Sequence, residues 1–545
     1  MSAPIASQSA TRRTLRIAIW IAVAVLAISR LLWLAADFPN YSPWMIDQAK
    51  FTDEGWWANA AVMHALTGHW HIAGDYNPAV PLPVWPMLLG GVFHFTGVSI
   101  VAARALSVFF SLATLAVVWL LVRRFAQSLR TAELAVLLLA ASPFAFVFSR
   151  LAILDTLVVF EFCLALLLGS RVAGAPDAGK PRIWLIAALA LLITAALLTK
   201  TTFAVLIPAI AWMAFRAGLR GQTKWPIALL RALIACAVMP LALVKLWAIF
   251  VTWLGYGADY NFFFSVNALE DVDWHQSLRW LHDLAVNGFW IDRLLYPAAL
   301  VVLVASVIFA RRLWRNPLFT ASWLAIAGES AFIFRVQDDY APRYFLATLV
   351  PTIFIVVLAL DEAPRTSRRA VAVFATLIIF AAVTANTVTI AGFLTHRQYQ
   401  LYSAAQDIAA HVRADSSRNQ LIFGVSAAEV GLIARLPSLN GAYGIDDMAA
   451  KVARYEPDWY LAWNDEIDYD ALRGYKLVPV ASYRIFDDDD RKVLTLYKLE
   501  SESASQRVSR SASRRVSERC RNGSKNDEIG TKMAENSPKF EGRVN

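Results

Sequence analysis

Two adjacent acids, Asp53 and Glu54, are the first residues of the chain whose type and setting could support catalysis. They stand at the start of a tryptophan-rich segment, residues 51–66, that predicts a helix. Thr52 or Asp53 could simply cap this helix, because acids in a first turn suit the helix dipole. A carboxylate held near a membrane surface could instead act as a general base toward a hydroxyl group. Both interpretations stay open at this point.

Further ionisable residues stand singly at the ends of apolar runs. Asp155 follows Arg150 closely, so the two could neutralise each other, or Asp155 could join Asp53 in an anionic site. Lys200 lies in a short turn, where it could snorkel to the interface or bind a phosphate. Arg343 also stands at a boundary, and a guanidinium there is suited to a two-pronged contact with a lipid phosphate.

Weaker candidates lie in other polar segments. Tyr256 and Asp259 open a long loop and could line a substrate cavity or anchor that loop at the interface. His64, His69 and His71 lack a second ligand cluster, so we predict no metal site. No phosphate-binding loop or dinucleotide fingerprint appears, which argues against a nucleotide donor.

The composition predicts a chain solvated mostly by lipid. Of its 545 residues, 58% are hydrophobic and 17% are charged, and the mean hydropathy is +0.47. Soluble proteins average about 25% charged residues. The net charge of +9 falls in a C-terminal tail and in short loops between apolar runs, which indicates membrane orientation and no nucleic-acid partner.

Eleven apolar runs approach the ~20 residues that a helix needs to cross a bilayer. A twelfth run, 78–97, is interrupted by four prolines. If it does not cross, six basic loops share one face, as the positive-inside rule requires. We therefore predict an interfacial or re-entrant helix there. The eleven runs are 14–36, 99–122, 132–149, 152–170, 182–198, 201–216, 226–254, 291–310, 317–335, 343–361 and 370–394.

This topology makes the N-terminus cytoplasmic and everything after residue 394 extracytoplasmic, in a multi-pass membrane protein. We expect the membrane to be a bacterial inner membrane. It places Asp53, Asp155, Lys200 and Arg343 on one outer face, which carries few other cations, Lys50 among them. Acids and single cations on one face would suit an enzyme that takes an anionic lipid carrier from the membrane.

The chain divides into three predicted parts: a transmembrane catalytic domain at 1–394, a small extracytoplasmic α/β domain at 395–500, and a disordered basic tail at 501–545. The fold class is thus mainly α, with a small C-terminal α/β domain. Its predicted elements are a helix at 399–413, strands at 421–425, 458–463, 477–485 and 493–499, and a hairpin turn at 487–490.

Six segments, in order over residues 50–350, resemble GT-C type membrane glycosyltransferases, in particular glycosyltransferase family 39 with its protein O-mannosyltransferases and aminoarabinose transferases. One departure is Asn77, since many relatives carry a lysine just before the paired prolines. The matching segments are Asp53 to Ala58, Pro78 to Trp85, Gly97 to Arg104, Ser142 to Asp155, Leu198 to Lys200 and Pro342 to Pro351.

The resemblance implies transfer of a sugar from a polyprenyl-phosphate-linked donor to an acceptor hydroxyl at the extracytoplasmic face. The acceptor could be a glycan, a lipid or a protein, no cofactor is firmly implied, and a divalent cation stays open. The predicted site comprises the catalytic residues Asp53, Glu54 and Asp155, the donor phosphate ligands Arg150, Lys200 and Arg343, and the cavity residues Tyr256, Asp259 and Tyr344.

Two other classes compete with a transferase. A secondary transporter or lipid flippase of the envelope glycan pathway would show inverted repeats and ionisable groups at mid-membrane depth. We find no repeat, and the ionisable groups stand at span ends. A sensor or scaffold would lose its function without residues 395–500, whereas a transferase is expected to keep some chemistry.

Overall fold

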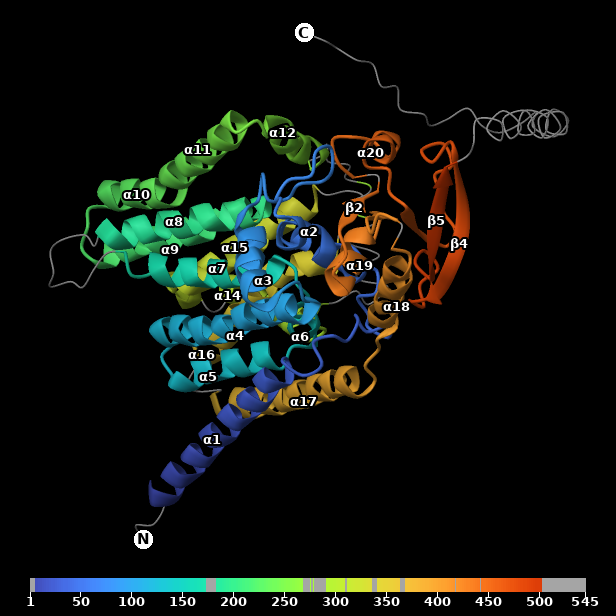
Figure 1. Ribbon diagram of the computed structural model, residues 1–545. Coiled ribbons are helices and arrows are strands. Elements are labelled where there is room, and N and C mark those ends of the chain that lie inside the picture. The colour runs from blue at the N-terminus through green and yellow to red at the C-terminus, as the bar shows by residue number, and fades with distance from the viewer. Residues whose placement is uncertain are drawn as a thin grey trace, which may run out of the picture.

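The computed structural model describes residues 5–172, 183–267, 275, 278, 291–308, 311–335, 341–362, 368–416, 418–441 and 443–501. A body of helices forms most of the molecule, and a small sheet with its own helices lies at one end (Figure 1). The predicted tail beyond residue 501 lies outside the described residues.

Helices coincide with all eleven apolar runs, and short 3-10 or π-helical elements extend several of them. The first half of the chain forms α1 (Ile5–Ser29), η1 (Gln48–Lys50), α2 (Asp53–Thr67), α3 (Val84–Thr96), α4 (Ile100–Phe125), α5 (Leu129–Ala140), α6 (Pro143–Phe148), α7 (Asp155–Gly169), α8 (Ile183–Thr199), η3 (Thr201–Leu206), α9 (Ile207–Arg220), α10 (Trp225–Leu233), η4 (Ile234–Val238), α11 (Met239–Trp253) and α12 (Gly257–Val266). The next segments form α14 (Leu295–Ile308), η5 (Arg311–Arg315), α15 (Pro317–Ile333), η6 (Pro342–Phe345), α16 (Leu346–Asp361) and α17 (Arg368–Thr395).

Some predicted runs differ from the helices that they form. The run 132–149 is divided between α5 and α6, because the Ser142 side chain caps α6 by accepting from Ala145 N and Pro143 occupies the first helical turn. The proline-interrupted run 78–97 begins its helix, α3, only at Val84, and this helix packs against α2 and α4.

Five stretches among the described residues are long and apolar enough to cross a membrane: Ile100–Phe125, Thr201–Arg220, Trp225–Trp253, Pro342–Asp361 and Thr376–Ala414. The last of these combines most of α17 with the separate helix Gln400–Ala414 that follows it. Large apolar side chains on α10, α11, α14 and α17 face outward, as lipid contact requires. The prediction of a membrane protein is confirmed.

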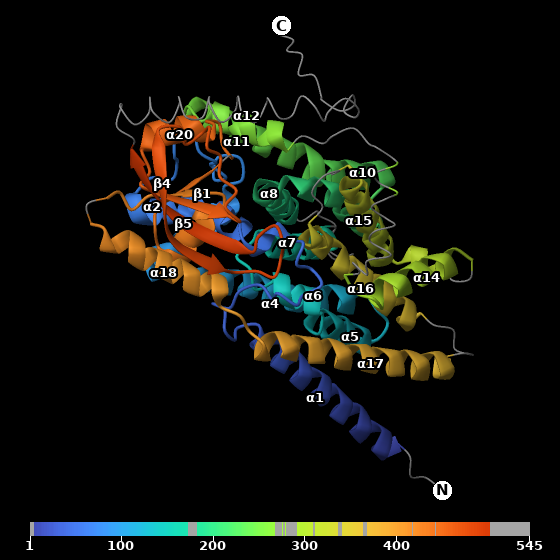
Figure 2. The same ribbon diagram turned by 90° about the vertical axis from the view of Figure 1, so that its right-hand side faces the viewer.

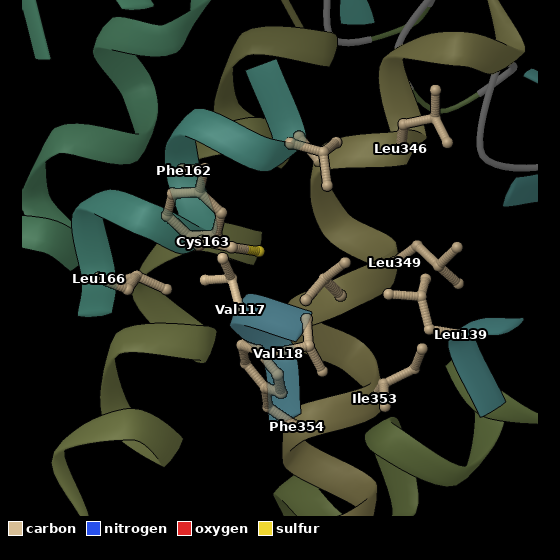
Figure 3. Packing of buried hydrophobic residues seen from close by; sticks show 14 of the residues in the cluster. Val117, Val118, Leu139, Phe162, Cys163, Leu166, Leu346, Leu349, Ile353 and Phe354 are labelled. Carbon is tan, nitrogen blue, oxygen red and sulfur yellow. The ribbon is translucent and has the colours of Figure 1, made fainter. Parts of the chain in front are cut away.

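The helical core forms around α16, whose residues from Leu346 to Leu358 are all buried. A helix that is apolar on every side belongs inside a bundle. Side chains from α4, α5 and α7 pack on it, and Figure 3 shows Val117, Val118, Leu139, Phe162, Cys163 and Leu166 facing Leu349, Ile353 and Phe354.

The C-terminal domain is a five-stranded mixed sheet with strand order β2-β1-β3-β5-β4. Strand β1 runs parallel to β2 and β3, and β5 runs antiparallel to β3 and β4. The predicted fold class is therefore confirmed. Its elements are α18 (Gln400–Ala414), β1 (Ile422–Gly424), α19 (Ala427–Ala434), β2 (Ser438–Asn440), α20 (Met448–Tyr455), β3 (Trp459–Trp463), β4 (Tyr475–Arg484) and β5 (Val493–Ser501).

Helix α2, which carries the acidic pair, lies where the two parts of the molecule meet (Figures 1 and 2). It packs against α3 of the helical body and against α19 and β2 of the C-terminal domain. The start of α2 is therefore in contact with both parts.

Candidate active site

A small pocket opens among the ends of several helices of the body. Asp155 is the first residue of α7, Lys200 follows α8 directly, and Tyr344 lies in η6 just before α16. Its wall comprises Asp155, Val158, Val159, Lys200, Thr202, Leu206, Glu329, Tyr344, Leu346 and Ala347.

Lys200 and Asp155 form an ion pair in the wall of this pocket. The Lys200 Nζ atom donates to Asp155 Oδ1 at 2.5 Å, and both side chains are largely buried. The same ammonium group lies 4.6 Å from the centre of the Tyr344 ring. A cation on an aromatic face with one carboxylate partner can exchange that partner for another anion.

Arg343 connects Tyr344, in the wall of this pocket, to Asp53, although neither Arg343 nor Asp53 is itself among the lining residues. Its Nη2 atom lies 2.7 Å from Asp53 Oδ2, and its Nη1 atom donates to Asp47 Oδ1. The Arg343 backbone N–H also donates to Asp47 Oδ2 at 2.9 Å. The guanidinium lies 5.2 Å from the ring centre of Tyr344. Asp53, Arg343, Tyr344 and Lys200 therefore form one continuous set of contacts.

Asp53 is a buried carboxylate at the first position of α2. Burial raises its pKa, Arg343 opposes this, and the nearby charges of Asp47 and Asp155 raise it further. The Thr52 side chain makes no capping bond to the helix and instead donates to Asp53 Oδ1 at 3.1 Å. The carboxylate thus faces charged groups, and its basicity is higher than that of an exposed aspartate.

Glu54 points to a different set of partners and does not line the pocket. Arg104 holds it in a two-pronged contact, with Nε–Oε1 and Nη2–Oε2 distances of 2.8 and 2.6 Å. The backbone N–H of Ala152 also donates to Glu54 Oε1 at 2.5 Å. Arg104 in addition donates to the carbonyls of Leu34 and Ala36. This network joins α2 to α4 and to the loop after α1.

Arg150 does not pair with Asp155, so the idea that these two neutralise each other is wrong. The Arg150 Nη2 atom donates to the carbonyls of Leu32 and Trp33, at 2.6 and 2.8 Å. Its guanidinium lies over the Phe146 ring, 5.0 Å from the centre. It is not among the residues that line the pocket.

Tyr256 and Asp259 also lie away from the pocket wall. Asp259 accepts from Asn77 Nδ2 at 2.7 Å and lies 3.1 Å from His71 Nε2. Tyr256 packs on the ring of His71. Asn77, which stands where many relatives have a lysine, thus joins the first long loop to α12.

Two acids of the site were not singled out from the sequence. Glu329 lines the pocket from α15, within the predicted span 317–335. An acid inside an apolar run is itself a signal of function, and this rule could have found it. Asp47 caps η1 in a polar loop, where nothing in the sequence distinguishes it. Within the described ranges, no group of three or more His, Cys, Asp or Glu side chains could hold a metal ion.

Comparisons with known proteins concern the family and the fold of the chain. The family model of dolichyl-phosphate-mannose-protein mannosyltransferases matches residues 78–246. No curated protein sequence matches the chain. The chain therefore resembles this family over the part that carries Asp155 and Lys200.

Solved structures show the same fold. ArnT from Cupriavidus metallidurans in the apo state has a TM-score of 0.55 and 17% identity over 90% of this chain and 98% of that one. ArnT bound to undecaprenyl phosphate has a TM-score of 0.53 and 17% identity over 88% and 97%. Archaeoglobus fulgidus AglB, in complex with an inhibitory peptide and a dolichol-phosphate, has a TM-score of 0.50 and 12% identity over 86% and 73%. The chain therefore has the GT-C fold of membrane glycosyltransferases, and the matching family model supports glycosyl transfer as its activity.

Proposed function

We propose that this protein is a glycosyltransferase that moves a sugar from a polyprenyl-phosphate-linked donor to an acceptor hydroxyl. The observation that carries the proposal is the continuous set of contacts from Asp53 through Arg343 to Tyr344 and Lys200, the last two of which line the pocket. It puts a carboxylate of raised pKa beside the Arg343 cation, and Tyr344 links that cation to a second one, Lys200. Two cations near one another are suited to stabilise a departing phosphate. The ArnT structure that contains undecaprenyl phosphate supports the choice of donor.

The two cations are the proposed ligands of the donor phosphate. Without donor, Lys200 is neutralised by Asp155, and Arg343 by Asp47 and Asp53. A phosphate monoanion accepts charge-assisted hydrogen bonds of the same kind from these groups, and in this proposal it replaces one carboxylate contact at each cation. Arg343 would then turn from Asp53 toward the phosphate, and Asp53 would be free to accept a proton.

The reaction proposed for this arrangement is a direct displacement. The Asp53 carboxylate accepts the proton of the acceptor hydroxyl while that oxygen bonds to the anomeric carbon of the sugar. The bond between the anomeric carbon and the phosphate oxygen breaks, and its electron pair leaves with the polyprenyl phosphate. Lys200 and Arg343 stabilise the charge that develops on this leaving group.

The other predicted residues receive supporting roles in this proposal. Glu54 and Arg104 hold the start of α2 against α4. Arg150 binds two carbonyls of the segment that follows α1. Asp259 and Tyr256 position the first long loop through His71.

We further propose that the site faces the extracytoplasmic side of a bacterial inner membrane, with the N-terminus in the cytoplasm. The six basic loops on the opposite face support this orientation. The boundary proposed near residue 394 is supported by the end of α17 at Thr395 and the start of α18 at Gln400.

Mass spectrometry of lipid-linked sugars and surface glycans in cells lacking this protein tests the proposal. A transferase predicts that one polyprenyl-phosphate sugar accumulates and that one sugar is missing from a glycan, lipid or protein. These two species would name donor and acceptor. Unchanged glycans together with unchanged lipid-linked sugars would contradict a role in glycosyl transfer.

A further inference from the structure

The first turn of α2 touches the C-terminal domain directly. The backbone N–H of Gly55 donates to Glu429 Oε2 at 2.7 Å. A side chain at Gly55 has no room, because its Cβ atom would lie 2.1 Å from the backbone nitrogen of Glu429. One turn further along, Ser438 Oγ donates to Asn59 Oδ1 at 3.0 Å. Helices α2 and α19 therefore meet at van der Waals distance.

This contact lies on the face of α2 opposite the catalytic carboxylate. Successive residues of an α-helix turn by about 100°, so Gly55 and Asn59 share one side, and Asp53 points about 160° away from Gly55. The C-terminal domain thus supports α2 from behind while Asp53 faces Arg343. A shift of α19 would therefore remove the support on the side of α2 that lies away from Asp53.

Glu429 itself is fully buried and only partly satisfied. Its Oε1 atom makes no hydrogen bond with the described residues. The charged groups around it are Glu54, Arg104 and Asp53. Burial and the Glu54 charge raise the pKa of Glu429 well above its usual range, and Arg104 opposes this. The Oε2 atom of Glu429 nevertheless accepts from Gly55 N–H, so this side chain joins α19 to the first turn of α2.

A second contact fixes the chain on the other side of Asp53. Lys50, in η1, donates to Asp488 Oδ2 of the hairpin between β4 and β5 and to the carbonyl of Met45. The Asp47 that caps η1 is the residue that holds Arg343. The C-terminal domain therefore contacts the chain three residues before Asp53 and two residues after it.

We propose that Glu429 is a positioning residue for Asp53, through which the C-terminal domain completes the active site. This inference rests on the proposed function, in which Asp53 is the general base. It revises the expectation that a transferase keeps its chemistry without residues 395–500, because α2 would lose the support behind its first turn.

The test compares variants of the full-length protein in detergent or nanodiscs. The substrate probes are synthetic undecaprenyl-phosphate monosaccharides with a radiolabelled sugar, and membranes from cells lacking the protein supply the acceptor. Glu429→Met fills the same space but cannot accept from Gly55 N–H. We expect kcat to fall about 100-fold, the cost of a misplacement of about 1 Å, with an unchanged KM for the donor.

Glu429→Gln keeps an acceptor oxygen and is neutral, so it should restore kcat to within about threefold of wild type and leave the pH–rate profile in place. Ser438→Ala is the matched control, since it removes a contact of the same interface without touching the first turn, and it should keep the wild-type kcat. If Glu429→Met does not fold, Glu429→Asp, whose shorter side chain cannot reach Gly55, takes its place and should lower kcat in the same way.

Asp53→Asn, measured beside these variants, distinguishes a failure of the positioning role of Glu429 from a failure of the proposed function. An inactive Asp53→Asn together with a wild-type kcat in folded Glu429→Met would overturn the positioning role alone. Normal turnover in Asp53→Asn would instead overturn the proposed function. A fall in kcat shared equally by Glu429→Met and Glu429→Gln would also contradict the inference, because the amide preserves the contact to Gly55.

Discussion

Lys451 forms a completely buried ion pair with Asp75, and we predict that Lys451→Met loosens the C-terminal domain from the first long loop. Both side chains have 0% exposure, and Nζ lies 2.9 Å from Asp75 Oδ1. The ammonium also donates to the carbonyls of Asn440, Gly441 and Tyr443. Four acceptors therefore each lose one donated hydrogen bond when the lysine is replaced.

The expected cost follows from this burial. Removing one partner of a buried ion pair leaves an uncompensated charge and costs about 3–5 kcal/mol. Since every 1.4 kcal/mol is about tenfold in an equilibrium constant, local opening should become roughly 100- to 4,000-fold more frequent. The control is the ion pair Arg454–Asp446, whose side chains are 47% and 20% exposed. Arg454→Met should cost less than about 1 kcal/mol.

Hydrogen exchange read by mass spectrometry measures this opening. The reporters are the amides of Asn440, which donates to Asp75, and of Asp446, which donates to the carbonyl of Gly74. Asp75→Asn combined with Lys451→Met should restore much of the protection, because no unpaired charge remains. Equal exchange in Lys451→Met and Arg454→Met would refute the reasoning.

Three further predictions concern the pocket and its supports. Lys200→Ala should raise the KM for the donor and should lower kcat by about 10²–10³-fold, the cost of losing one transition-state hydrogen-bond donor. Steady-state kinetics measures both, and an unchanged KM would show that Lys200 does not hold the phosphate. Transfer needs a deprotonated Asp53, and burial raises the pKa of this residue. On acidification, kcat/KM should therefore begin to fall at a pH above the ordinary aspartate pKa of about 3.9. A pH profile of kcat/KM that stays flat down to pH ~4 would exclude Asp53 as the base. Gly55→Ala should lower the free energy of unfolding by about 1–3 kcal/mol, because the added Cβ would overlap the backbone of Glu429. Thermal unfolding measures this, and an unchanged melting temperature would show that α2 and α19 separate freely.

Much of the architecture could be predicted because apolar runs and alternating strands are local patterns. The runs 317–335 and 370–394 became α15 and α17 nearly residue for residue. Strands at 458–463 and 493–499 were found for the same reason, and the turn at 487–490 joins β4 to β5. Helix α19 and strand β2 were missed, since a short buried element has no polar face to mark its period.

The pairing of charges could not be predicted, because it depends on contacts distant in the chain. Topology placed Asp155 and Lys200 on one face, but only the packing of α7 and α8 makes them partners. Lys50 was an unexplained cation of the outer face until Asp488, 438 residues later, was found beside it. A single sequence contains no signal for a contact between two residues so far apart in the chain.

The central claim is that Asp53 is the general base of glycosyl transfer, and Asp53→Asn tests it most directly. The measurement is single-turnover transfer of radiolabelled sugar from synthetic undecaprenyl-phosphate monosaccharides to membranes of cells lacking the protein, with binding of undecaprenyl phosphate as the control for folding. The account predicts retained lipid binding and a transfer rate reduced by about 10²–10⁴-fold, the contribution of a positioned general base. A transfer rate near wild type in a variant that binds the lipid normally would contradict it.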